Sequence, residues 1–208
     1  MTTIYLRKDT NLPERHINDV YRTEINLIRA ALTRYAPSWT RTVLDIGAGD
    51  GRWGQIAREM TEARFVAGVE IEDQPCPEGF NDWHCPQDFL TWKTGRRFHL
   101  ICGNPPYYCA EQIIRRAWDM LEENGRMIML LRLAFQAGVD RYHGLWKDLP
   151  LAELAVCSRR PSFYGGGTNG TDYAIFFWAK TEYGDPAGTP RRWPTTLLYH
   201  ERDKVNVQ

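Results

Sequence analysis

The amino-acid sequence predicts an α/β fold in which a mostly parallel sheet is covered by helices on both of its faces. Two patterns predict it: short apolar runs of strand length alternate with segments of helical periodicity, and a central run is apolar throughout, as in a strand buried on both faces. The composition agrees, because 208 residues with 43% hydrophobic and 25% charged side chains can bury a sizeable core.

The first half of the chain supplies the first helix and three strands. The spacing of apolar residues over 23–35 predicts a helix, with Thr23 as its N-cap and Pro37 after its end. Apolar runs at 42–46 and 65–71 predict strands on either side of a helix at 53–60. A short strand is expected at 83–85.

The second half completes a sheet of seven strands. A strand at 98–102 precedes a helix at 111–122, a turn at Asn124-Gly125 and the apolar strand at 127–131. The last two strands, 154–158 and 173–179, have only a Gly-rich loop between them, so we expect an antiparallel edge there.

These elements predict a single domain over residues 1–180, with the helical segment 1–40 packed on it. The tail 181–208 contains three prolines and is expected to be irregular. No apolar run approaches the roughly 20 residues that span a bilayer, so no membrane partner is expected. We expect no secretory leader, because residues 1–10 contain no apolar core. The five cysteines have neither disulfide-scaffold density nor metal-ligand spacing. We therefore expect a cytoplasmic protein without a bound metal.

The formal net charge is zero, which excludes a uniformly basic nucleic-acid binder. The charge is divided, however: residues 1–90 hold 10 Lys and Arg against 14 Asp and Glu, whereas residues 91–208 hold 16 against 12. A local basic surface in the second half therefore remains compatible with a nucleic-acid partner.

Polar side chains and glycines follow the first three strands. Asp45 near the end of the first strand precedes Gly47, Ala48 and Gly49, and glycines there let the backbone approach a ligand closely. A carboxylate at that place suits a cationic ligand such as an amino-acid ammonium group. Later glycines also match the dinucleotide fingerprint, so a nicotinamide dehydrogenase is one alternative.

The next two strand ends add a ribose and an adenine subsite. Glu70, followed by Ile71, can accept both hydroxyl groups of a ribose, and Asp88-Phe89 offers an acceptor and an apolar ring for adenine. Ligands bind at the carboxyl ends of such strands. The series resembles the S-adenosylmethionine site of the Rossmann-like class I methyltransferases, and this resemblance implies that fold and that cofactor.

The fourth strand ends in Asn104-Pro105-Pro106-Tyr107. Two prolines make the loop stiff, so the Asn104 side-chain oxygen and the Pro105 carbonyl become fixed acceptors for a planar amino group, on whose ring Tyr107 can stack. This chemistry is suited to methylation of a conjugated amine. The motif resembles that of the DNA adenine-N6 methyltransferases, and it also marks glutamine-N5 and some RNA methyltransferases.

A late segment favours the DNA enzymes among these families. Arg159-Arg160-Pro161-Ser162-Phe163 before the strand at 173–179 is similar to the corresponding segment of phage and bacterial DNA N6-adenine methyltransferases. By this resemblance Phe163 stacks on the flipped adenine opposite Tyr107, the arginines contact phosphates, and Thr23 contacts the methionine part of the cofactor. Residues 173, 176 and 178 are expected in the core because they lie in a strand.

We expect no separate target-recognition domain, because only 15 residues separate Asp88 from Asn104 and 28 follow Lys180. Recognition is therefore expected from the loops 135–150 and 160–171, with Arg132 beside the first of them, and with short or relaxed sequence specificity. The predicted function is methyl transfer from S-adenosylmethionine to the N6 amine of adenine in DNA. The alternatives are an RNA adenine-N6 or protein glutamine-N5 methyltransferase and a catalytically silent, cofactor-binding adaptor subunit.

Overall fold

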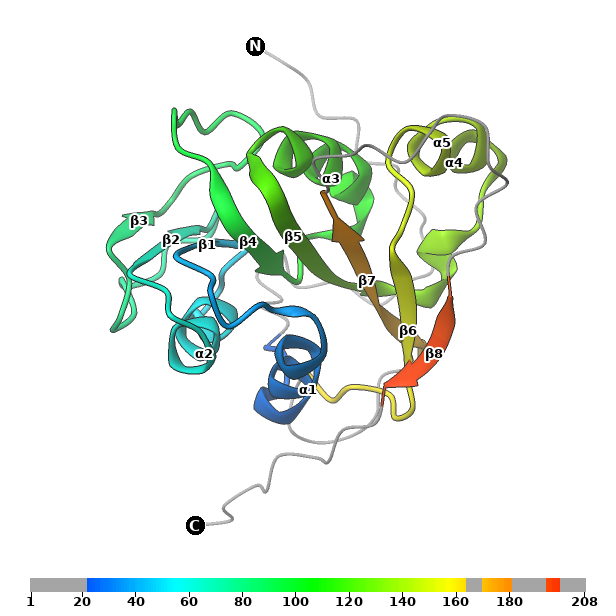
Figure 1. Cartoon of the computed structure of the whole chain (residues 1–208), viewed down its shortest axis with the longest axis horizontal. Helices are drawn as coiled ribbons and strands as arrows, with labels where there is room; N and C mark the ends of the chain where they lie inside the picture. Colours follow the sequence, from blue (N-terminus) through cyan, green and yellow to red (C-terminus); the bar gives the residue numbers. More distant parts are fainter. Residues whose placement is uncertain (1–21, 164–169, 181–193, 199–208) are drawn as a thin grey trace, which may run out of the picture.

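One mixed sheet with helices on both faces forms the core of the computed structural model (Figure 1), which describes residues 22–163, 170–180 and 194–198. The strands are β1 (Thr42–Ile46), β2 (Phe65–Val69), β3 (Asp82–His84), β4 (Phe98–Gly103), β5 (Leu121–Arg132), β6 (Glu153–Cys157), β7 (Tyr173–Ala179) and β8 (Thr195–Leu198). The α-helices are α1 (Ile25–Tyr35), α2 (Arg52–Met60), α3 (Ala110–Asp119), α4 (Val139–His143) and α5 (Leu145–Asp148), with short 3-10 helices at Tyr107–Cys109 and Leu133–Gln136.

The strands lie in the order β3-β2-β1-β4-β5-β7-β6-β8. The pairs from β3 to β5 are parallel, and so is the pair of β6 with β8, whereas β7 is antiparallel to both of its neighbours. All strands except β7 therefore end at one edge of the sheet, which we call the carboxyl edge.

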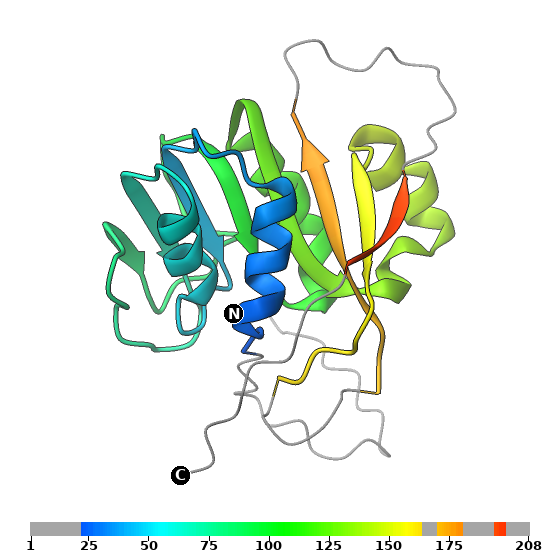
Figure 2. The same cartoon turned by 60° about the horizontal axis from the view of Figure 1, so that its bottom comes forward.

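Alternate residues of the central strands enter two separate apolar cores. Met127, Met129 and Leu131 of β5 face a core shared with α3 and α5. Ile128 and Leu130 face the opposite core, shared with α1 and α2. Figure 2 shows this arrangement, with α1 in front of the sheet and α3, α4 and α5 behind it. A run without polar alternation is thus buried on both faces, as the sequence predicts.

The antiparallel strand is internal, not an edge as the sequence suggested. β6 lies beyond β7, and β8 pairs in parallel with β6 from Leu154↔Thr195 to Cys157↔Leu198. β8 falls within the tail that was expected to be irregular and brings the sheet to eight described strands. The rest of that tail lies outside the described residues.

Two helix boundaries also differ from the expected ones. The N-cap position of α1 belongs to Glu24, and Thr23 uses its hydroxyl oxygen to accept a hydrogen bond from Trp53 Nε1 (3.3 Å). α3 ends at Asp119, and β5 begins at Leu121, with a shift in its register against β4 before Arg126. Asn124, at φ +65°, is part of this irregular strand start. None of the described helices is long and apolar enough to cross a membrane.

Candidate functional site

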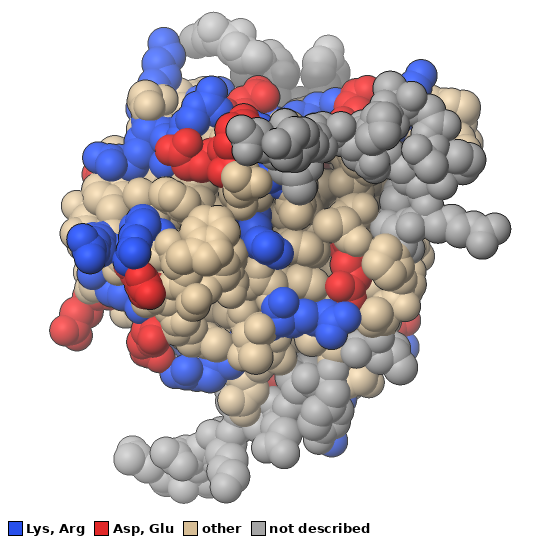
Figure 3. Space-filling view, in the orientation of Figure 1, with Lys and Arg blue, Asp and Glu red and all other residues tan. Residues whose placement is uncertain are grey.

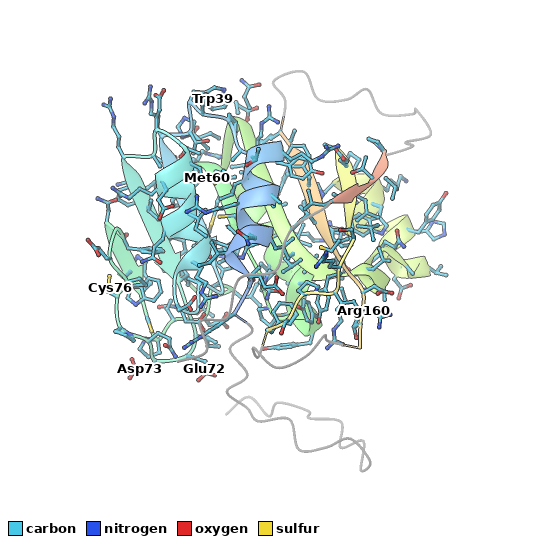
Figure 4. The ribbon with its side chains drawn as sticks, turned by 90° about the horizontal axis from the view of Figure 1, so that it is seen from below. Trp39, Met60, Glu72, Asp73, Cys76 and Arg160 are labelled. Carbon is cyan, nitrogen blue, oxygen red and sulfur yellow. The ribbon has the colours of Figure 1, made fainter. Side chains whose placement is uncertain are left out.

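The residues singled out by the sequence gather at the carboxyl edge. In Figure 4, Glu72 and Asp73, which follow β2, lie at the same end of the sheet as Arg160, which follows β6, and Trp39 lies at the opposite end. Parallel strands bring their ends together in this way although the residues are far apart in the sequence.

The loop after β1 turns tightly because its glycines adopt left-handed backbone angles. Gly47 has φ +62° and Gly49 has φ +54°, which other residues adopt only with strain. Gly47 and Ala48 donate backbone hydrogen bonds to the Val69 carbonyl (3.0 and 3.2 Å), so the loop is tied to the end of β2.

This loop lies directly against the Asn-Pro-Pro-Tyr segment. A Cβ placed on Gly47 would be 3.5 Å from Pro105 Cα and 3.6 Å from the Asn104 carbonyl oxygen. The approach follows from the register in which Ile46 of β1 pairs with Gly103 of β4. The predicted cofactor loop and the predicted catalytic loop are therefore neighbours.

Asp45 is completely buried below the Gly-rich loop. Its Oδ2 accepts a hydrogen bond from the Gly54 backbone N–H (2.8 Å), while its Oδ1 is buried without a hydrogen-bond partner. Burial raises the pKa of Asp45 well above its usual range, the Gly54 N–H opposes this, and the nearby Glu70 raises it further. A buried acceptor of this kind is the place where a cationic ligand group gains most.

Glu70 is also buried and joins two loops. Its Oε2 accepts from the Gly49 N–H (2.6 Å), and its Oε1 accepts from the Glu72 N–H (2.9 Å). Each carboxylate oxygen has further acceptor capacity, so these bonds orient the side chain without exhausting it.

The remaining residues predicted to bind the cofactor differ in their exposure. Ile71 is 55% exposed, although it directly follows the buried Glu70. Asp88 is partly buried and caps the following turn through the Leu90 N–H (2.8 Å), whereas the Phe89 ring is buried in the core. Of these two apolar side chains, only Ile71 is therefore exposed.

The Asn-Pro-Pro-Tyr segment holds its own side chains together. The Tyr107 hydroxyl donates a hydrogen bond to Asn104 Oδ1 (3.1 Å), and Pro106 is exposed beside the buried Pro105. The Arg132 guanidinium lies 4.9 Å from the centroid of the Tyr107 ring, at the end of the adjacent strand β5. Arg132, predicted to contact the substrate, thus lies beside the Asn-Pro-Pro-Tyr segment, and its contact there is with the Tyr107 ring.

Phe163, to which the resemblance assigns stacking on a flipped adenine, is a buried residue in the structure. It is only 5% exposed, and its ring packs edge-on against Tyr173 with 5.1 Å between centroids. Tyr173 in turn lies 6.0 Å from Tyr107, so the three rings form a continuous cluster. The expected core positions Tyr173, Phe176 and Trp178 are fully buried, which confirms that prediction.

The basic side chains of the late segment are partly used within the protein. Arg160 forms an exposed ion pair with Asp172 (2.8 Å). The expected loop 135–150 contains α4 and α5, and Trp146 is a core residue, 4% exposed, so this loop is less open than predicted. Residues 164–169 of the second loop lie outside the described residues. On the face of the molecule seen in Figure 3, the described Lys and Arg residues are interspersed with Asp and Glu.

Sequence reasoning missed Glu24. Its carboxyl group is buried, 6% exposed, and accepts a hydrogen bond from the Ser162 backbone N–H (2.7 Å), 138 residues away. An acidic residue at a helix start ordinarily indicates a solvated cap, and no local pattern reveals such a distant partner. Within the described part of the chain, no group of three His, Cys, Asp or Glu residues could hold a metal ion.

Comparison with known proteins gives partial sequence matches. No family model matches the chain. It is 30% identical over 82 residues to a tRNA1(Val) (adenine(37)-N6)-methyltransferase of Glaesserella parasuis, a match that covers 35% of each protein. It is 32% identical over 69 residues to the type II methyltransferase M.CvrRI of Paramecium bursaria Chlorella virus XZ-6E, a match that covers 32% of this chain and 18% of the relative. The chain thus spans about a third or less of the curated relatives it matches.

A solved structure matches much more of the chain. A Listeria monocytogenes protein described as a class I S-adenosylmethionine-dependent methyltransferase superposes with a TM-score of 0.61 at 11% identity, covering 88% of this chain and 68% of that one. The chain therefore has the Rossmann-like fold of the class I methyltransferases, as the motifs predict.

Proposed function

We propose that this protein transfers a methyl group from S-adenosylmethionine to the exocyclic N6 amine of adenine in DNA. The observation that carries the proposal is the contact between the two loops. A Cβ placed on Gly47 would lie within 3.6 Å of both the Pro105 Cα and the Asn104 carbonyl oxygen. A methyl donor held at the first loop would be next to an amine held at the second.

The cofactor side offers groups suited to each part of S-adenosylmethionine. The buried Asp45 Oδ1 has no hydrogen-bond partner, and we assign it to the cationic amino-acid end. Glu70 would accept the ribose hydroxyls, and the exposed side chain of Ile71 would cover adenine. When bound, the cofactor supplies an electrophilic methyl group.

The substrate side offers acceptors for the two amino hydrogens of adenine. Asn104 Oδ1 and the Pro105 carbonyl would take these hydrogen bonds, drawing the hydrogens from the ring plane and increasing lone-pair density on N6. In the free protein, Asn104 Oδ1 accepts from the Tyr107 hydroxyl. Binding of the amine would replace that bond and leave the Tyr107 ring to stack on the base. Rate enhancement would then come from positioning and electrostatics.

The partial relatives support a nucleic-acid substrate, because one is named as a tRNA adenine-N6 methyltransferase and the other as a type II methyltransferase. The Arg-Pro-Ser-Phe segment at 160–163 favours DNA by its resemblance to DNA enzymes. The tRNA enzyme favours RNA as the second candidate.

The test is product analysis. The protein is incubated with methyl-labelled S-adenosylmethionine and unmethylated DNA, or with unmodified tRNA, and the nucleic acid is digested to nucleosides. The expected product is N6-methyldeoxyadenosine from DNA. Label only in N6-methyladenosine from tRNA would transfer the proposal to RNA, and label in neither would contradict it.

A further inference from the structure

The dipeptide Thr23-Glu24 at the start of α1 contacts both predicted binding sites. It lies between the Gly-rich loop with its helix α2 and the segment 158–163, which follows β6. Figure 2 shows the start of α1 beside that segment. The mechanism proposed above uses no contact of Glu24.

On the cofactor side, Thr23 is anchored to the first turn of α2. Its hydroxyl oxygen accepts a hydrogen bond from Trp53 Nε1 (3.3 Å), and its carbonyl accepts one from the Arg52 guanidinium (3.2 Å). Arg52 also pairs with Asp50 of the Gly-rich loop (2.9 Å). The position of residue 23 is therefore tied to that loop.

On the substrate side, Glu24 is anchored to the segment 158–163. It accepts the Ser162 N–H at 2.7 Å while almost completely buried. Its position near the end of β6 is also visible in Cys157, where burial raises the pKa to about 12 and the charge of Glu24 contributes to the rise. Ser162 directly precedes Phe163, whose ring packs on Tyr173 beside Tyr107.

We propose that Glu24 is a positioning residue that couples cofactor binding to the geometry of the target-base site. It fixes the backbone at Ser162 and thereby the Phe163 ring, and its neighbour Thr23 follows the position of the Gly-rich loop. The proposal rests on the proposed function for the identity of the two ligands. Because coupling between two binding sites is reciprocal, cofactor would order the segment 158–163, and target DNA would strengthen cofactor binding.

Hydrogen exchange read by mass spectrometry tests this without any methylation assay. Peptides covering 158–163 are followed in the wild type, Glu24→Ala and Glu24→Gln, with and without S-adenosylhomocysteine. In the wild type the ligand should slow exchange of the segment. In Glu24→Ala the segment should exchange about tenfold faster, the loss expected for one buried hydrogen bond with a carboxylate acceptor. S-adenosylhomocysteine should still bind with affinity within about twofold of the wild type but no longer slow that exchange.

Matched variants separate positioning from a general loss of structure. Glu24→Gln keeps an acceptor oxygen and should restore both effects. Glu59→Ala removes another acidic side chain, from an exposed ion pair with Arg29, and should change neither. Ser162→Pro removes the N–H donor and leaves Glu24 in place, so it should reproduce Glu24→Ala if that variant fails to fold. Peptides covering β1 (Thr42–Ile46) report global opening.

Three outcomes would overturn the coupling. They are a Glu24→Ala segment that is protected like the wild type, a ligand effect that persists in that variant, and a wild-type segment that bound S-adenosylhomocysteine leaves unchanged. Equal acceleration in β1 would show a structural role only. Failure of the wild type to bind S-adenosylhomocysteine would refute the proposed cofactor and the coupling with it. The exchange rate of segment 158–163 in Glu24→Ala, compared with the wild type, would still show whether Glu24 anchors the segment. Normal coupling without adenine methylation would refute the proposed substrate alone.

Discussion

The two halves of the carboxyl edge are built by different interactions. In the half formed by β1 and β2, the buried carboxylates of Asp45 and Glu70 are held by backbone N–H groups at 2.6 to 2.9 Å. In the half formed by β4, β5, β7 and β6, the rings of Tyr107, Tyr173 and Phe163 pack against one another and Arg160 makes an exposed ion pair. Main-chain hydrogen bonds to buried carboxyl groups are costly to break, whereas an exposed ion pair contributes little. The first half is thus suited to a constant ligand and the second to a substrate that rearranges it.

The largest expected effect comes where the two halves meet, at Asn104. Asn104→Ala removes one of the two acceptors for the amine, and the methylation rate at saturating cofactor should fall about 100- to 1,000-fold, by analogy with loss of one oxyanion-hole group. Single-turnover kinetics measures it. Asn124→Gly is the control, because Asn124 is exposed and has φ +65°, which glycine adopts freely. A wild-type rate in Asn104→Ala would contradict the mechanism.

Asp45→Asn tests whether the cofactor half depends on a buried charge. It keeps an acceptor for the Gly54 N–H but loses the carboxylate, so affinity for S-adenosylhomocysteine should fall about 10- to 100-fold, as for a charged hydrogen bond. Calorimetry measures this. An unchanged affinity would remove Asp45 from the site.

The raised pKa of Asp45 adds a pH dependence to the same test. The native state holds this proton more tightly than the unfolded chain, so its free energy of unfolding falls as the pH rises from the unfolded pKa near 3.8 toward the native pKa. Cofactor affinity should rise over the same window as Asp45 ionises. Urea unfolding and calorimetry at several pH values should show both trends in the difference between the wild type and Asp45→Asn, because other shifted groups such as Glu153 are common to the two proteins.

Substitutions of Phe163 test whether this side chain only stabilises the core or also binds the substrate. Phe163→Ala should lower the free energy of unfolding by about 3 kcal/mol, because the ring is buried. Phe163→Leu should stay within about 1.5 kcal/mol of the wild type. Loss of base stacking should nevertheless weaken its binding to DNA about tenfold. Urea unfolding and fluorescence anisotropy measure the pair, with Phe98→Leu, at the start of β4 and thus at the opposite end of the sheet, as a buried control in the other core. Unchanged DNA affinity in Phe163→Leu would make Phe163 a core residue only.

The smallest effect is expected at the exposed pair of Arg160 with Asp172. Arg160→Ala should change the free energy of unfolding by less than about 1 kcal/mol. It should reduce the slope of log affinity against log salt by about one unit if Arg160 contacts a phosphate. Arg41→Ala, from the ion pair with Glu62, is the matched control. A wild type whose DNA affinity does not depend on salt would contradict nucleic-acid binding altogether.

Several elements could be predicted because their determinants are local. The turn after β1 needs glycines at positive φ, and the alternation of strand and helix follows from apolar periodicity, so β1, α2 and β7 were expected close to their observed bounds. The start of β5 could not be predicted in this way. Residues 121–125 have helical and turn-forming character, and only pairing with β4 makes them part of a strand.

The sequence by itself determined the order of the elements from α1 to β5 and which residue types stand at the ends of those strands, because periodicity and turn chemistry act between near neighbours. The tertiary structure decided three further matters. It placed β8 outside β6 and made β7 internal, buried Phe163 against Tyr173, and gave Glu24 a partner 138 residues away. Each depends on contacts between distant segments, whose pairing is set by the packing of the whole sheet and its helices, and no short stretch of sequence records it.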